Sequence, residues 1–141
     1  MHPSARWLFL YCFALLLPVA AWAQSTLPQA AERTKQAWRA HDPQAVVGQS
    51  SSVVLQIPGA DPSSPLGRAQ AVELLRRYLR PAEERGLDVT AIREVEPGKG
   101  FVELIRRYVV AGTSELRRET LLLGFRRVAG EWRLAELRSA P

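Results

Sequence analysis

The sequence predicts a single α+β domain in which three N-terminal helices pack on a mostly antiparallel sheet. Apolar residues recur at helical spacing through much of the first half of the chain, whereas from Leu87 onward they alternate with polar residues at strand spacing. A run of helices followed by a run of strands is typical of α+β proteins, whose helices cover one face of an antiparallel sheet. The expected order is helix, helix, strand, helix and then four strands.

Residues 1–23 have the three parts of a secretory signal peptide. Arg6 precedes the apolar run WLFLYCFALLLPVAAWA, and the AWA motif that ends at Ala23 matches an A-x-A cleavage site. We therefore expect cleavage after Ala23, loss of Cys12 with the signal, and a secreted or periplasmic domain spanning residues 24–141. An uncleaved N-terminal anchor is the alternative. The expected mature chain has neither a cysteine nor a stretch of transmembrane length, so it should fold without disulfides and without a stable membrane span.

The first two helices are predicted from their start and stop signals. Thr26 and Gln29 form a capping-box pattern at the start of the first helix. A short second helix should follow, with Asp42 as its N-cap, Pro43 at its first position and Gly48 at its end.

A strand and a third helix follow. The β-branched and apolar residues at positions 53–57 predict a short strand. After the loop PGADPSSPLG, a third helix is expected to begin at Arg68, to kink at Pro81 and to end with Gly86 as its C-terminal cap.

The last four segments alternate apolar and polar residues and are separated by the turns PGKG, GTS and AGE, which predicts an antiparallel meander. Both faces of this sheet are apolar in the middle. In the strand LLLGFRRV, one face carries Leu121, Leu123 and Phe125, and the other carries Leu122 and Val128. One face can pack on the helices, and the other then needs a second cover. We therefore expect a homodimer through the outer face of the sheet.

These segments resemble the nuclear-transport-factor-two-like superfamily, the cone-shaped α+β fold of ketosteroid isomerases, scytalone dehydratase and polyketide cyclases of the SnoaL type. The resemblance is carried by a Trp-containing first helix and by the motifs HDPQAVVGQ, SSVVLQIPG, GRAQAVELLRRYL and GEWRLAELR. Within the superfamily the chain is most similar to a bacterial group of exported small domains of unknown function. The resemblance implies a curved sheet wrapped on helices around a conical pocket, frequent dimerisation through the sheet, and binding or protein interaction rather than catalysis.

Five side chains are candidates for lining such a pocket: Trp38, His41, Tyr78, Tyr108 and Trp132. The tyrosines and tryptophans could contact a ligand, and they would serve equally well as core or core-edge residues. Because His41 is the only histidine of the expected mature chain, neither a paired-histidine metal site nor a His–Cys relay can be built. We expect no catalytic residue, no metal and no cofactor.

Two carboxylates on predicted strands, Glu103 and Glu119, are the other candidates for chemistry. A carboxylate base in an apolar pocket would suit an isomerase or a dehydratase. We favour the alternative, in which each carboxylate forms a cross-strand pair with Arg107, Arg117 or Arg118.

The chain is basic, and all but two of its 19 lysine and arginine residues are arginine. This composition suits an anionic partner, although a GC-rich genome explains it without a function and is the interpretation we favour. Export makes nucleic acid an unsuitable partner. The sequence therefore predicts non-enzymatic binding of a small apolar or amphipathic ligand in the cone. The alternatives are a protein-interaction module with a cone filled by side chains, and an isomerase- or dehydratase-like enzyme.

Overall fold

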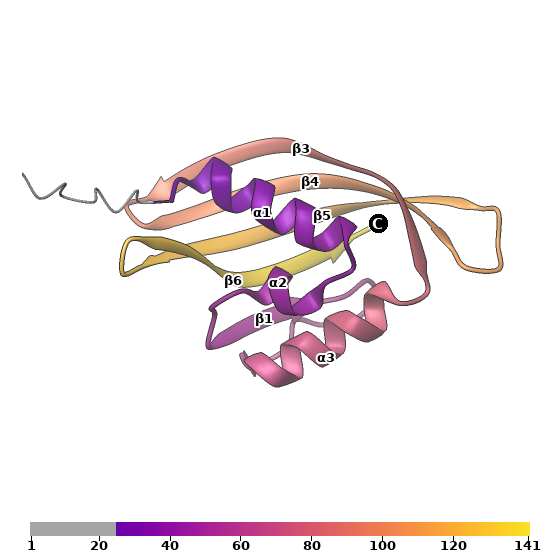
Figure 1. Cartoon of the computed structure of the whole chain (residues 1–141), viewed down its shortest axis with the longest axis horizontal. Coiled ribbons are helices and arrows are strands. Elements are labelled where there is room, and N and C mark those ends of the chain that lie inside the picture. Colours follow the sequence, from indigo (N-terminus) through magenta and orange to yellow (C-terminus); the bar gives the residue numbers. More distant parts are fainter. Residues whose placement is uncertain (1–24) are drawn as a thin grey trace, which may run out of the picture.

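The computed structural model describes residues 25–141, in which helices pack on a curved sheet (Figure 1). The elements are α1 (Leu27–Arg39), α2 (Pro43–Val47), β1 (Ser52–Gln56), β2 (Leu66–Gly67), α3 (Arg68–Leu79), β3 (Ala82–Glu96), β4 (Lys99–Val110), β5 (Leu116–Val128) and β6 (Glu131–Ala140). The predicted fold class is confirmed, and the predicted element order holds except for the additional strand β2. The expected signal peptide and its cleavage site lie outside the described residues.

Helix α1 begins where the capping-box pattern predicts. The Thr26 hydroxyl accepts a hydrogen bond from the Gln29 amide at 3.3 Å, and the Gln29 side chain accepts one from the Thr26 amide at 3.0 Å. These two bonds satisfy backbone donors that the first helical turn leaves free. The buried side of α1 consists mostly of small residues, and Leu27 and Trp38, near its two ends, are its larger buried side chains. The helix can therefore lie close to the sheet.

Strand β1 joins the meander from the side opposite β3. It pairs in parallel with β6 and antiparallel with β2. The sequence did not predict β2, because its two residues, Leu66 and Gly67, are too few to show a strand period. Helix α2 precedes β1, and the Asp42 carboxylate caps it by accepting a hydrogen bond from the Ala45 amide at 3.1 Å.

The predicted end of α3 is wrong. The helix ends at Leu79 and β3 begins at Ala82, so Pro81 terminates the helix instead of kinking it, and Gly86 lies inside a strand. Proline has no amide hydrogen with which to continue a helix, and the residues after it pair with β4 instead. At Gly86 the strand register shifts, and a Cβ there would approach the Arg107 guanidinium to 2.7 Å. The absence of a side chain at Gly86 gives the Arg107 guanidinium room to lie against the strand.

Strands β3 to β6 form the predicted antiparallel meander within a sheet of order β2-β1-β6-β5-β4-β3. The tight turns include Gly98, Ala129 and Gly130, all at positive φ, which is the geometry of short hairpin turns.

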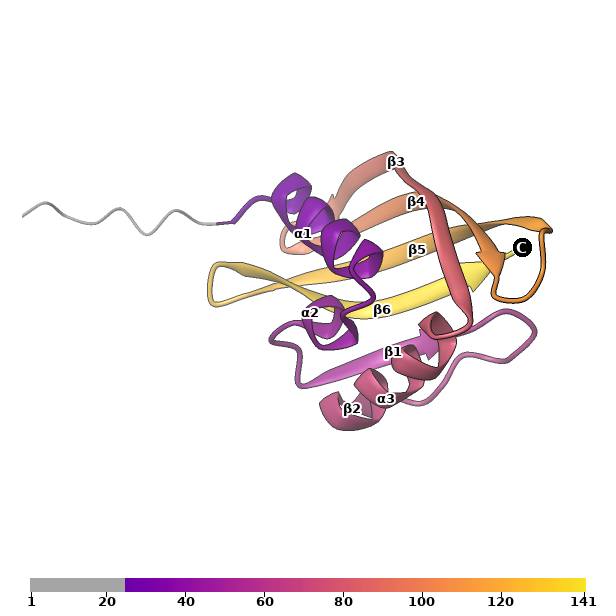
Figure 2. The ribbon, with the colours of Figure 1, turned by 45° about the vertical axis from the view of Figure 1, so that its right-hand side comes forward.

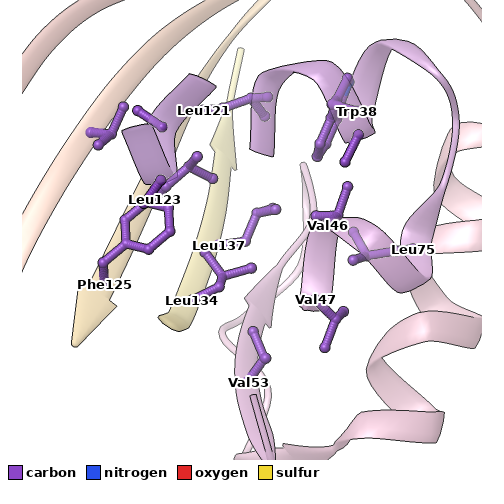
Figure 3. Close-up of a cluster of buried hydrophobic side chains, with 14 of the residues drawn as sticks. Trp38, Val46, Val47, Val53, Leu75, Leu121, Leu123, Phe125, Leu134 and Leu137 are labelled. Carbon is purple, nitrogen blue, oxygen red and sulfur yellow. The ribbon is translucent and has the colours of Figure 1, made fainter. Parts of the chain in front are cut away.

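The three helices cover the same face of the sheet, which we call the inner face (Figure 2). Side chains from this face and from the helices form one apolar core, which Figure 3 shows in part. The labelled members are Trp38, Val46, Val47, Val53, Leu75, Leu121, Leu123, Phe125, Leu134 and Leu137. Within residues 25–141, no helix covers the opposite, outer face, and no helix is long and apolar enough to cross a membrane.

The capping box should contribute measurably to stability. Thr26→Ala removes the hydroxyl that accepts the Gln29 amide hydrogen, so we expect the free energy of unfolding to fall by about 1 kcal/mol in urea denaturation. Gln36→Ala, on the exposed side of the same helix, is the control and should leave stability within about 0.5 kcal/mol. Equal effects of the two substitutions would contradict a specific role for the cap.

Candidate functional site

The inner face of the sheet carries a fully buried charge, the guanidinium of Arg106. Strand β4 places this side chain on the same face as Val102 and Leu104, which belong to the apolar core. Removing an ion from water costs several kcal/mol unless opposite charges and hydrogen bonds compensate it. The neighbours of Arg106 therefore determine whether the site is a stable part of the core or a binding site.

Two carboxylates from the neighbouring strands compensate Arg106. Its Nε donates to both oxygens of Glu84 on β3 at 3.0 Å, and its Nη1 donates to Glu119 Oε1 on β5 at 2.8 Å. The two glutamate side chains are only 8% and 3% exposed. Burial alone lowers the pKa of Arg106, but the hydrogen bonds and charges of Glu84 and Glu119 outweigh it and raise that pKa above its usual high value. The guanidinium is permanently charged.

Aromatic rings surround the same guanidinium. The Arg106 Cζ atom lies 4.0 Å from the ring centroid of Tyr108, 5.1 Å from that of Trp38 and 5.2 Å from that of Tyr78. The rings of Trp38 and Tyr78 also meet edge to face, with centroids 6.1 Å apart. The guanidinium lies over all three rings, and the electron-rich face of an aromatic ring stabilises a desolvated cation.

Tyr78 and His41 complete the cluster. The Tyr78 hydroxyl donates to Glu119 and lies 3.3 Å from Ser139 Oγ. Burial, followed by the hydrogen bond to Glu119, raises the pKa of Tyr78 far above its usual value, so this side chain is a neutral donor. At the other end, His41 Nε2 lies 3.3 Å from Glu84 Oε1, and the histidine side chain is 31% exposed. His41 is thus where the cluster meets solvent.

Four of the five predicted pocket residues therefore gather around one point. Trp38, His41, Tyr78 and Tyr108 all contact Arg106 or its counterion Glu84. The rings of these residues were expected to contact a ligand. The rings of Trp38, Tyr78 and Tyr108 instead contact the Arg106 guanidinium.

Trp132 lies apart from this cluster. Its ring centroid is 5.0 Å from the Arg127 guanidinium carbon, and its backbone amide donates to Ser25 Oγ at 3.4 Å. It packs near the start of α1, beside Leu27 and Ile92.

The predicted partners of the two strand carboxylates are wrong. Glu119 pairs with Arg106, which lies directly opposite it in the β4–β5 register. Glu103 instead accepts a hydrogen bond from the Thr90 hydroxyl at 2.8 Å and forms no ion pair with any residue of the described part. The pairing partner of a strand carboxylate depends on register, which the sequence does not show.

Sequence reasoning missed Arg106 and Glu84. A signal for Arg106 was nevertheless present, because Arg106 has the same parity as Val102 and Leu104 along its strand. Arg106 occupies a position on the buried face of its strand, and Glu119 does so on the next strand. Opposite charges on the buried faces of neighbouring strands indicate an internal ion pair. Glu84 gives no such signal, because the residues around it are also compatible with a continuation of the preceding helix, and strand parity cannot be applied to a helix.

The cluster fills the part of the cone around Arg106. Between Trp38, Leu104 and Leu121 there is no room even for a water molecule. A general base must reach the proton it removes, and Glu84 and Glu119 are instead held by Arg106. Within the described residues, no group of three or more His, Cys, Asp and Glu side chains is placed to hold a metal ion. The geometry is that of a polar core.

Comparisons with solved structures establish the fold, which is that of the nuclear-transport-factor-two-like proteins. A ketosteroid isomerase-like protein from Erwinia carotovora atroseptica matches 86% of this chain and 99% of its own, with a TM-score of 0.68 and 16% identity. A putative calcium/calmodulin-dependent protein kinase type II association domain from Thiobacillus denitrificans matches 82% of this chain and 94% of its own, with a TM-score of 0.66 and 17% identity. An NTF-2 like protein of unknown function from Shewanella oneidensis matches 81% and 95%, with a TM-score of 0.59 and 13% identity.

No family model matches the chain, and a comparison with curated proteins finds no match. The similarity to solved structures is therefore a similarity of fold.

The buried ion pairs predict a large and specific effect of substitution. Arg106→Met leaves two buried carboxylates without a counterion, so we expect the free energy of unfolding to fall by about 3–5 kcal/mol in urea denaturation. The triple variant Arg106→Met, Glu84→Gln, Glu119→Gln removes all three charges and should recover most of this loss.

Arg107→Met is the matched control, because Arg107 is the next residue and its ion pair with Asp88 is exposed. It should change stability by less than about 1 kcal/mol. A triple variant no more stable than Arg106→Met alone would show that the charges do not determine the loss.

Proposed function

We propose that this protein is an exported, non-enzymatic association domain that pairs with a second copy of itself through the outer face of its sheet. One observation carries the proposal: the inner face is packed around Arg106, whereas the middle of the outer face presents half-buried apolar side chains, Ile105 and Leu122, that no described element covers. Uncovered apolar sheet faces are commonly sites of protein association.

The charges around this apolar centre suit a second copy. In the register of β4 and β5, the Ile105–Thr120 pair lies between Glu103 on one side and the Arg107–Arg118 pair on the other. A two-fold axis along the Ile105–Thr120 row would reverse the strands and set Glu103 of each copy against the arginines of the other. Neither Glu103 nor Arg118 forms an ion pair within residues 25–141, so both charges are available for such a contact.

The packing of the cone supports association over the two alternatives. A drug-sized ligand needs a cavity of at least about 300 Å³. The packing of Trp38, Leu104 and Leu121 leaves no such space, and the hollow between α1, α2 and Trp132 holds only about 170 Å³. An isomerase or dehydratase needs a carboxylate that is free to accept a proton, and the two carboxylates inside the cone are bound to Arg106.

Native mass spectrometry of the protein, expressed with its own N-terminus and recovered from the exported fraction, tests the whole proposal. We expect a dimer of subunits that begin at Gln24. A monomer at micromolar concentration would contradict pairing, and a subunit that retains residues 1–23 would contradict signal cleavage. Mass in excess of the protein would instead support a ligand held in the cone.

Ile105→Glu places a charge on the proposed two-fold axis, where it faces the same charge of the second copy. Because burying two like carboxylates against each other is costly, we expect the dimer dissociation constant to rise by about tenfold or more, without unfolding of the subunit. The control is Leu116→Glu, which adds the same charge at an exposed position at the start of β5. Light scattering at several concentrations measures the change, and an Ile105→Glu variant that dimerises like the control would place the interface elsewhere.

A further inference from the structure

The outer face also contains a hollow at one end of the sheet, which we call the outer hollow. It has a volume of about 560 Å³ and lies over β1, β6, β5 and the start of β4. Its charged lining consists of Lys99, Arg126, Arg133, Arg138 and Glu136. Along β4, Lys99 is six residues from Ile105, which is about 20 Å at the usual rise of a strand. Lys99 therefore lies far from the centre of the proposed dimer interface, whereas Arg138, which lies opposite Leu122, marks where the outer hollow adjoins that interface.

Three of these cations form a row across adjacent strands. Lys99 on β4 lies opposite Arg126 on β5, which in turn lies opposite Arg133 on β6. Neighbouring strands are about 4.8 Å apart, so the Cα atoms of the three residues fall within about 10 Å. Like charges directly opposite each other destabilise a sheet. Within residues 25–141, no acid forms an ion pair with any of the three.

Arg133 has unused hydrogen-bonding capacity in this row. Its Nε is buried, yet it has no hydrogen-bond partner within the described part of the chain. A buried N–H without an acceptor is costly, and native proteins usually supply a partner for it. Arg138, by contrast, pairs with Glu136 at 3.2 Å, so the fourth cation is already compensated.

The rest of the hollow combines three serines with apolar side chains, and its backbone is irregular. Val54 and Phe101 contribute half-buried apolar side chains. In the strand register Glu136 and Gly124 lie between them, and a Cβ on Gly124 would come within 2.5 Å of the Glu136 side chain, which lies over the glycine. Beside Gly124 the β5–β6 register shifts, which leaves Ala135 as an extra residue in β6. Such bulges are frequent beside functional sites.

We propose that the outer hollow binds a soluble organic anion, with its carboxylate or phosphate group on the Lys99–Arg126–Arg133 row and its apolar body over Val54 and Phe101. Guanidinium groups bind the planar carboxylate and the phosphate oxygens through paired hydrogen bonds, and the adjacent apolar surface favours a ligand that is more than a bare ion. An anion in this place compensates the three cations and supplies an acceptor for Arg133.

Calorimetric titration with three probes tests both parts of the proposal. Octyl phosphate, used below its micelle-forming concentration, carries the charge and the apolar body; inorganic phosphate carries only the charge; octyl glucoside carries only the apolar body. Octyl phosphate should bind at least tenfold more tightly than either of the others, and its affinity should fall as salt is added. Inorganic phosphate binding as tightly would overturn the apolar part, and octyl glucoside binding as tightly would overturn the anionic part.

Arg126→Gln removes the central charge of the row. We expect it to weaken octyl phosphate binding at least tenfold while raising the melting temperature of the ligand-free protein, because it relieves the repulsion between three adjacent cations. Arg117→Gln is the matched control: it removes an arginine from the other end of the same strand and should leave binding unchanged. Equal binding by Arg126→Gln and the native protein would overturn the site.

The oligomeric state, measured on the same samples, separates this proposal from the previous one. A monomer that binds octyl phosphate would support the hollow and contradict the dimer, and a dimer without binding would do the reverse.

Discussion

The ion pairs of Arg106 are the constraint on which the rest of the structure depends. Glu84, Arg106 and Glu119 come from three successive strands, so the pairs connect β3, β4 and β5 across the inner face. Tyr78 extends the cluster to α3, and Trp38 extends it to α1. A buried cation needs both carboxylates, which fixes the strand register and the positions of the helices together.

Patterns among residues close in sequence predicted most of the fold. The features that they did not predict depend on pairing between residues far apart in sequence. The capping box at Thr26 and the hairpin turns could be predicted because they depend on residues close in sequence. The residues after Pro81 are compatible with a helix, and only their pairing with β4 makes them a strand. Likewise, several arginines could serve Glu119, and the register alone selects Arg106. Strand parity, applied to charged residues as strictly as to apolar ones, would have identified Arg106 and Glu119 as buried charges that need partners, but not as partners of each other.

The two faces of the sheet use charge in opposite ways. On the inner face, each charge of the cluster has a partner, and the cone that the resemblance implied as a pocket is closely packed around Arg106. On the outer face, Lys99, Arg126 and Arg133 stand in a row without acids, and apolar side chains lie uncovered. Unfavourable features that bring no structural gain, such as repulsion between neighbouring charges or uncovered apolar surface, are expected at functional sites. This contrast is why we place binding and association on the outer face.

The central claim is that Arg106 is a permanent, closed part of the core, and the nitrogen-15 NMR spectrum of its side chain tests that claim most directly. The Arg106 Nε–H donates to both oxygens of a buried carboxylate. Its signal should therefore be sharp at neutral pH and exchange with solvent over hours, since exchange requires opening of the core. An Arg106 Nε–H that exchanges as fast as those of exposed arginines such as Arg117 would contradict the account, because it would show that the cone opens readily to water.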